Sequence, residues 1–212
     1  MPRHRLQLLT LFGLVFYCTS SHAAGIIRDV GKHPHYSVEL EPHFVWTWGW
    51  LPHNSGDGLG VGLRASIPLF HNGPIGTINN NMAISSGFDW AHSSARCGPG
   101  VHPPPGYPPN YYYYNGFYDC TANSFWLPVA LQWNFFLTDV VSVFGEPGLA
   151  FVHERWSDWV PCAPGGVCQY DRSDTTLHPV LWGGARFLFT DSIGVTVRLG
   201  VPSISAGLSI LL

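Results

Sequence analysis

The last twenty-one residues, Ser192 to Leu212, constrain the fold more than any other stretch of the sequence. Two runs there alternate between apolar and small polar side chains, and Pro202 separates them. Successive side chains of a strand point to opposite faces, so each run predicts a two-faced β-strand. The apolar positions are Ile193, Val195, Val197, Leu199 and Val201, then Ile204, Ala206, Leu208, Ile210 and Leu212. Either a protein core or lipid must cover such a face.

The same alternation recurs upstream and predicts six further strands. Together the predicted strands cover residues 36–50, 59–69, 82–91, 125–137, 141–151, 178–189, 192–201 and 203–212. Two segments, NFFLTDVVSVFG and RFLFTDSIGVTV, predict similar hairpins that turn at Thr-Asp pairs. This short internal repeat favours an antiparallel up-and-down meander over a solenoid.

The N-terminus has the composition of a secretory signal peptide. Arg3 and Arg5 precede an apolar run from Leu6 to Tyr17, and the small-residue region SSHAAG follows. We therefore predict a cleaved signal peptide over residues 1–23 and a periplasmic lead-in over residues 24–35. No later segment offers about 18 uninterrupted apolar residues, so helical membrane spans are not expected.

The distribution of charge indicates that lipid covers the apolar faces. Charged residues make up 11% of the chain, against roughly 25% in ordinary soluble domains, and Lys32 is the single lysine. Every charged residue within the predicted strands lies on the less apolar face. These residues are Glu39, Glu41, Arg64, Asp89, Glu146, Arg186 and Arg198. A narrow lumen requires acids and bases that neutralise one another, so we predict that they form a polar network inside a barrel.

The predicted fold is thus all-β, an eight-stranded antiparallel up-and-down transmembrane β-barrel over residues 36–212. Eight strands are the smallest number that commonly closes, and closure removes the open edges that hydrocarbon does not tolerate. The alternative is a secreted soluble β-barrel. Long outer loops are predicted over residues 96–122 and 157–176, and long loops belong outside the cell, which places both termini in the periplasm.

The predicted outer loops carry the four cysteines that follow the signal peptide and a run of tyrosines. Export and an even count favour disulfides, with local pairing within each loop as the hypothesis. The cysteines are Cys97, Cys120, Cys162 and Cys168. The run Tyr111, Tyr112, Tyr113 and Tyr114 offers a large aromatic contact surface for another cell surface or a polysaccharide. Packing of this loop over the barrel mouth is an equally good interpretation.

These features together resemble the small outer-membrane β-barrel proteins of Gram-negative bacteria, the OmpA/OmpX/OmpW-like group. The signal peptide, the eight alternating segments, the tight inner turns and the closing SISAGLSILL carry the resemblance. Leu212 departs from the group, in which a terminal aromatic residue is commoner. The resemblance implies a location in the outer membrane, contact with its lipid, and a structural, adhesive or protective role without a particular ligand.

Candidate catalytic and metal-binding residues are few. His92 and Ser94 share the spacing of the His-x-Ser motif of outer-membrane lipid A deacylases, where His activates a Ser nucleophile, but Ala95 replaces the Asn of that family and no acid partner is evident. His33 and His35 lack the three or four ligands of a metal site. No P-loop, nucleotide fingerprint or zincin motif is present, so we expect neither a cofactor nor a metal.

The sequence therefore predicts a structural or surface-interaction protein that is not an enzyme. A lipid A deacylase and a narrow channel for small or apolar solutes are the alternatives. Ten Lys and Arg against thirteen Asp and Glu give a net charge of −3, which argues against nucleic acid as a partner. The charged lumen residues are expected to fill the interior, although a transport path is the competing interpretation. The sequence leaves the oligomeric state open.

Overall fold

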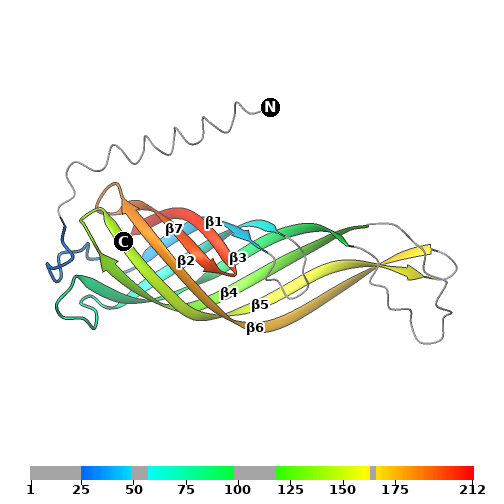
Figure 1. Cartoon of the computed structure of the whole chain (residues 1–212), viewed down its shortest axis with the longest axis horizontal. Coiled ribbons are helices and arrows are strands. Elements are labelled where there is room, and N and C mark those ends of the chain that lie inside the picture. Colours follow the sequence, from blue (N-terminus) through cyan, green and yellow to red (C-terminus); the bar gives the residue numbers. More distant parts are fainter. Residues whose placement is uncertain (1–24, 49–56, 98–117, 163–165) are drawn as a thin grey trace, which may run out of the picture.

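The protein is a closed antiparallel β-barrel in which each strand pairs with its neighbours in sequence and β1 pairs with β8 (Figure 1). A computed structural model describes residues 25–48, 57–97, 118–162 and 166–212. The strands are β1 (Glu39–Thr47), β2 (Gly58–Phe70), β3 (Asn80–Cys97), β4 (Tyr118–Phe136), β5 (Val141–Cys162), β6 (Gly166–Leu188), β7 (Ile193–Val201) and β8 (Ser203–Leu211). The predicted eight-stranded up-and-down barrel is confirmed. Within the described ranges, a helix of the length and apolarity needed to cross a membrane is not found.

Side-chain alternation sends apolar residues outward and polar residues into the barrel, as the sequence pattern predicts. Phe44 is 75% exposed on the outer face, whereas Glu146 and Arg198 inside the barrel are 0% and 1% exposed. The outer belt consists of large apolar side chains from all eight strands, including Phe44, Leu59, Leu63, Ile84, Leu131, Leu149, Leu181, Leu199 and Leu208. An apolar exterior around a polar interior is the reverse of a soluble fold and is the arrangement of membrane barrels.

The two Thr-Asp turns make the same hydrogen bonds, so the internal repeat in the sequence is also a structural repeat. Val141 N donates to Thr138 Oγ1 at 2.9 Å, and Ile193 N donates to Thr190 Oγ1 at 3.0 Å. In each turn the backbone amide of the threonine also donates to the carbonyl of the residue three positions later. A threonine hydroxyl that accepts from its own turn holds the two strands in register with only a few residues.

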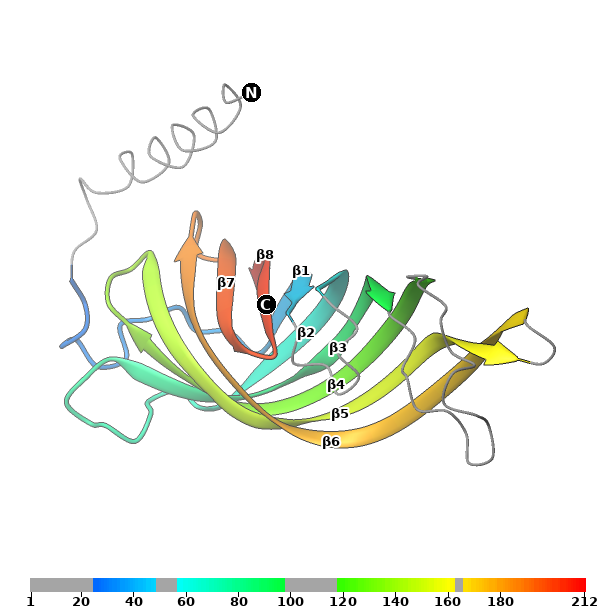
Figure 2. The ribbon, with the colours of Figure 1, turned by 45° about the vertical axis from the view of Figure 1, so that its right-hand side comes forward.

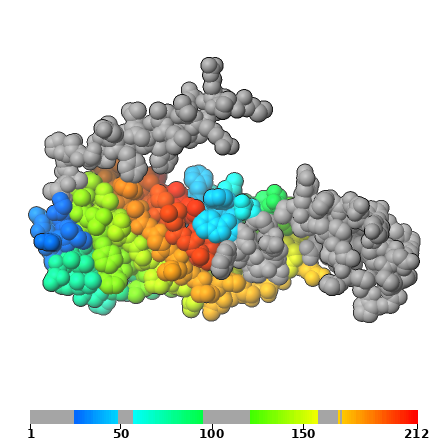
Figure 3. Space-filling view, viewed as in Figure 1, coloured from blue at the N-terminus to red at the C-terminus, as the bar shows by residue number. Residues whose placement is uncertain are grey.

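The N-terminal segment, residues 25–38, packs across the end of the barrel that carries these turns. Ile26 N donates to Leu137 O at 3.0 Å, and Asn79 N donates to Ile27 O at 2.7 Å. Figure 3 shows this segment, in blue, beside the β2–β3 link. The Asn80 side chain holds that link by donating to the carbonyl of Ile75 at 2.8 Å. The lead-in, which has no periodicity in the sequence, is therefore an ordered cap on the barrel.

Strands β3–β6 continue past the barrel on the opposite side from the cap (Figure 2). The pairing of β6 with β7 stops at Leu181 and Val201, but the pairing of β5 with β6 runs on to Cys162 and Gly166. We call residues 92–97, 118–123, 153–162 and 166–175 the outer extension. In this four-stranded sheet, β5 and β6 reach farthest.

The outer extension corrects the predicted loop boundaries. Residues 157–162 and 166–176 belong to β5 and β6, and residues 96–97 and 118–122 belong to β3 and β4, so these parts of the predicted loops 157–176 and 96–122 are strand. Beyond the apolar belt both faces of a strand can be polar, so the hydrophobic alternation that identifies a strand is lost although the backbone pairing continues. The predicted signal peptide and the run Tyr111–Tyr114 lie outside the described residues.

Candidate functional site

The seven charged residues predicted to face the lumen lie inside the barrel, and each is at most 5% exposed. They come from six strands, because inward positions on β1, β2, β3, β5, β6 and β7 converge at about the same depth. The seven are Glu39, Glu41, Arg64, Asp89, Glu146, Arg186 and Arg198. Together they form two ion-paired groups, which are described next.

The larger group is a chain of ion pairs centred on Glu146. Arg198 Nε donates to Glu146 Oε2 at 2.7 Å, and Arg64 Nη1 donates to the same oxygen at 3.3 Å. Arg198 also bonds to Glu41, and Arg64 Nη2 donates to Asp89 Oδ2 at 3.1 Å. Since an unpaired buried charge is costly, the shared carboxylate and the two arginines stabilise one another. The smaller group is the pair of Arg186 with Glu39.

Several residues of this network were not singled out by the sequence. His43 Nε2 lies 2.8 Å from Asp89 Oδ1 and its Nδ1 lies 2.9 Å from the carbonyl of Glu41, so His43 extends the charged chain. Toward the capped end, Asn134 Nδ2 donates to Asn81 Oδ1 at 2.7 Å. The inward parity that His43 shares with the two glutamates was the signal that could have identified it.

Aromatic rings pack against the arginines inside the lumen. The guanidinium carbon of Arg64 lies 4.6 Å from the ring centre of Trp182, and that of Arg198 lies 5.0 Å from the ring centre of Phe144. Cation–π contacts of this kind are worth about 2 kcal/mol or more when desolvated. Arg64 and Arg198 are therefore held by aromatic rings as well as by carboxylates.

Next to the network, on β4, β5 and β6, part of the inward face is apolar. We call the buried residues Trp126, Ala150, Val152, Val180 and Trp182 the mouth cluster. Glu154 follows it on β5, beyond the last apolar row of the exterior, and is 5% exposed. Burial, with a smaller effect of Asp174 opposite it, raises the pKa of Glu154 to about 7. The outer end of the barrel thus holds a carboxyl group that titrates near neutral pH.

On the outer surface, side chains change from apolar to polar along rows that cross β3–β6. The row Leu127, Phe151 and Leu177 is apolar. The next row toward the outer end is mixed, with Trp90, Phe125, His153 and Thr175. The two rows after that are polar and contain His92, Asn123, Arg155 and Ser173, then Ser94, Thr121, Ser157 and Asp171. The mixed row therefore marks the outer boundary of the apolar belt, where aromatic residues gather in membrane barrels.

The candidate catalytic pair, His92 and Ser94, lies in these polar rows on the exposed outer surface. The two residues share a face two positions apart on β3, which separates them by about 6.6 Å along an extended strand. This backbone spacing allows an imidazole to reach the hydroxyl, so the contact that the His92 ring makes is the relevant observation. The His92 ring instead bonds to Asn123 Oδ1 at 3.1 Å.

The histidines at the capped end form a stack. The rings of His33 and Phe136 lie 4.4 Å apart and nearly parallel, and those of His35 and His71 lie 5.3 Å apart. In the part of the chain that the structure describes, His, Cys, Asp and Glu side chains do not gather in threes in a way that could hold a metal ion. Burial lowers the pKa of His33, and the nearby His35 and His71 lower it further, against the opposing effect of its bond to Asn79.

The four predicted disulfide cysteines lie in strands near the outer end, but their side chains fall outside the described residues. Cys97 ends β3 and Cys162 ends β5, while Cys120 and Cys168 lie within β4 and β6. Their pairing stays a prediction.

A closed eight-stranded barrel with an apolar exterior and a polar, ion-paired interior is the architecture of small outer-membrane β-barrel proteins. No known protein family matches the sequence, and a search of curated proteins gives no significant match. Among solved structures, the chain is similar to Ail, the attachment invasion locus protein of Yersinia pestis. The structure of Ail with the heparin analogue sucrose octasulfate is 11% identical, covers 82% of this chain and 93% of its own, and has a TM-score of 0.39. A second Ail structure is 12% identical over the same shares, with a TM-score of 0.38.

Proposed function

We propose that this chain is an outer-membrane β-barrel protein with a surface-interaction role, carried by the outer extension. The observation that supports the proposal is the division of the molecule along its length. An apolar belt surrounds all eight strands, and four of them then continue as a sheet with polar side chains on its outward face. Lipid matches the belt, and a water-exposed partner matches the polar sheet.

The lumen supports this role better than transport. The ion-paired chain from Glu41 to Asp89 joins strands that lie across the barrel, and its arginines are at most 3% exposed. An eight-stranded interior is just wide enough for side chains to fill. The narrow channel remains an alternative, and planar-bilayer recordings with a stable, reproducible conductance would favour it.

The proposal also places this protein outside the enzymes. The bond of the His92 ring to Asn123 Oδ1 supports that choice, since the ring is held by a partner other than Ser94. A lipid A deacylation assay on the wild type and the Ser94→Ala variant tests it. We expect no release of fatty acid by either protein, and release that depends on Ser94 would reverse the choice.

Two further parts of the proposal concern the tyrosine run and the four cysteines. The segment with Tyr111–Tyr114 stands between β3 and β4 in the sequence, and the proposal assigns its tyrosines to contacts with another surface or a polysaccharide. Disulfides among the four cysteines would tie the outer strands. Thiol counting under denaturing, non-reducing conditions tests this, and free cysteine would contradict it.

Membrane fractionation with heat-modifiable gel mobility tests the location. We expect recovery in the outer membrane and a mobility shift on boiling, because closed barrels resist detergent until heated. Epitope tags test the orientation in intact cells. A tag between Cys162 and Gly166 should be reached by antibody, whereas a tag after Asp139 should not. Recovery as a soluble protein, or the opposite tag result, would refute the proposal.

A further inference from the structure

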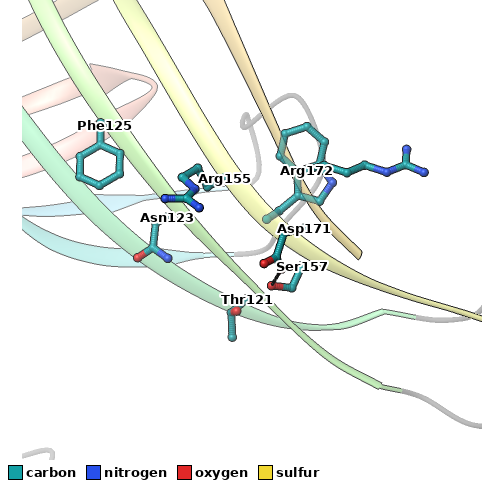
Figure 4. Close-up of a pocket in the computed structure, with 8 residues that line it drawn as sticks. Thr121, Asn123, Phe125, Arg155, Ser157, Asp171 and Arg172 are labelled. Carbon is teal, nitrogen blue, oxygen red and sulfur yellow. Dashed lines mark hydrogen bonds between the residues drawn. The ribbon is translucent and has the colours of Figure 1, made fainter. Parts of the chain in front are cut away.

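A hollow of about 250 Å³ lies on the outer extension and is built from three adjacent strands (Figure 4). Its lining is polar apart from two aromatic rings. The lining residues are Thr121, Asn123, Phe125, Arg155, Trp156, Ser157, Asp171 and Arg172. The sheet register explains why these residues meet. Asn123 pairs with Arg155, and Ser157 pairs with Asp171, so their side chains stand side by side on one face.

The polar groups of the hollow suit a ligand rich in hydroxyl groups. Ser157 Oγ donates to Asp171 Oδ1 at 3.0 Å, which orients that carboxylate and leaves its other oxygen to accept. The Asn123 carbonyl oxygen is occupied by His92, so its amide nitrogen remains as a donor. Thr121 adds a hydroxyl. Alternating donors and acceptors at this spacing match vicinal sugar hydroxyls, which both donate and accept.

Two further features of the hollow indicate that the ligand also carries a negative charge and a flat apolar face. Arg155 is exposed, and its guanidinium lies beside Asn123 in Figure 4. A guanidinium presents a planar fork of donors that fits a carboxylate or phosphate. Phe125 closes one end of the hollow, and its ring offers the apolar surface on which the C–H face of a sugar packs.

The position of the hollow relative to the membrane restricts where a ligand can come from. Asn123, Arg155 and Asp171 lie in the polar rows directly beyond the mixed row that contains Phe125. The hollow is therefore on the exterior of the barrel wall, at the height where polar lipid headgroups begin. A ligand there reaches the protein from the membrane surface or from the medium, and not through the lumen.

We propose that this hollow binds an anionic saccharide, a sugar that carries a phosphate or carboxylate group. Arg155 pairs with the anionic group, Asn123 and Asp171 bond to hydroxyls, and Phe125 packs against the ring. The proposal deepens the surface-interaction role and rests on it. The same chemistry is present in the headgroup of a phosphorylated glycolipid and in a soluble acidic polysaccharide, and the experiment separates these sources.

The test uses the full chain in lipid nanodiscs and the variant Arg155→Gln, with Arg28→Gln as the matched control. Arg28 is an exposed arginine of the cap at the opposite end, so its variant removes the same charge far from the hollow. In one arm the nanodiscs contain phospholipid only, and oligogalacturonate, a phosphorylated glucosamine disaccharide and neutral maltooligosaccharide are titrated. In the other arm the nanodiscs also contain phosphorylated glycolipid, and lipid retained by the protein is counted by native mass spectrometry.

We expect an acidic sugar to bind the wild type and Arg28→Gln equally, and Arg155→Gln about tenfold or more weakly, as for a lost charge-assisted hydrogen bond. The neutral maltooligosaccharide should bind the wild type more weakly than either acidic sugar does. If the source is the membrane, glycolipid should be retained by the wild type but not by Arg155→Gln, and should block the soluble sugar. If the source is soluble, the sugar should bind in both kinds of nanodisc.

Three results would overturn the saccharide site: equal affinity of Arg155→Gln and the wild type, an equal loss in Arg28→Gln, or no binding in either arm. Failure of the proposed function has a different signature. A chain that is not a membrane barrel would not enter nanodiscs with heat-modifiable mobility, and this is measured before any titration.

Discussion

The charged lumen and the mouth cluster occupy the same inward face of the barrel, yet they are stabilised in opposite ways. In the lumen, ion pairs join residues as far apart in sequence as Glu41 and Arg198. In the mouth cluster, two tryptophans and small aliphatic side chains pack as an ordinary apolar core. Arg64 touches both regions, because it bonds to Glu146 and lies over the Trp182 ring.

The difference shows what each region accomplishes. In the lumen, eight strands close into a ring. A buried charge is paired only when the correct strand supplies its partner, so the ion pairs favour one register of closure. The mouth cluster supports the strands that leave the ring, where packing requires apolar area and little orientation. Substitutions in the lumen, the mouth cluster, the mouth and the cap test this contrast.

The largest effect should come from Arg198→Met in the lumen. The change leaves Glu146 and Glu41 buried without their shared partner, which typically costs about 3–5 kcal/mol of unfolding free energy. Urea unfolding in lipid vesicles, followed by heat-modifiable mobility, measures it. Arg155→Met removes the same group from the exposed surface and should change stability by about 0.5 kcal/mol or less. Similar losses in both variants would mean that the lumen pairs do not specify closure.

Trp126→Ala in the mouth cluster should cost about 3 kcal/mol, since it opens a cavity against Val152 and Val180. We expect the loss to be local. Hydrogen exchange should speed up in the outer extension and hardly change in β7 and β8, where the ion pairs remain. The control is Phe151→Ala on the outward face, where the ring is 58% exposed and leaves no internal cavity. Uniform destabilisation of all eight strands would contradict a separate role for the mouth cluster.

Glu154 makes the stability of the mouth depend on pH. Its folded pKa of about 7 lies above the ordinary value, so the folded state binds a proton more tightly than the unfolded state. The stability that this provides is fully present below the ordinary value, about pH 4.5, and is lost as the pH rises through 7. Glu154→Gln should therefore be more stable than the wild type by about 1–2 kcal/mol at pH 8, after allowance for solvent screening.

Denaturant titrations at pH 5 and pH 8 measure this difference. At pH 5 the wild type and Glu154→Gln should be nearly equal, because the wild-type carboxyl is then neutral. Asp174→Asn should recover only a smaller part of the gain at pH 8, since burial affects the pKa of Glu154 more than Asp174 does. A pH-independent difference would show that Glu154 is ionised in the folded protein.

The smallest effect should be at the cap. Because burial lowers the pKa of His33, the contribution of its neutral ring is present above the ordinary pKa of 6.5 and is lost as the pH falls below it. The protection factors of the Ile26 and Asn79 amides, which correct for the slower intrinsic exchange at lower pH, should therefore fall between pH 7 and pH 5, by an amount of about 1 kcal/mol or less. His33→Phe keeps a stacked ring without a titrating group and should abolish the dependence. Persistence of the dependence in that variant would show that the titration of His33 does not cause it.

The number of strands, their faces and the inward charges could be predicted from the sequence, because a strand has a period of two and lipid demands one apolar face. Phe44 and Leu208, for example, are apolar side chains exposed on the outer face of the barrel. The outer extension could not be predicted in this way. Beyond the belt neither face needs to be apolar, so the segment around Arg155 and Asp171 has no periodic signal, although its backbone is fully paired.

The two faces of each strand thus follow from the sequence alone, since the alternation is local and is the same in any register. Which side chains meet across the barrel depends on how the strands are assembled. The pairing of Arg198 with Glu146, the stacking of His33 on Phe136, and the hollow between Asn123 and Asp171 all join residues far apart in the chain. Their proximity follows from barrel closure and strand stagger, and these are properties of all eight strands together.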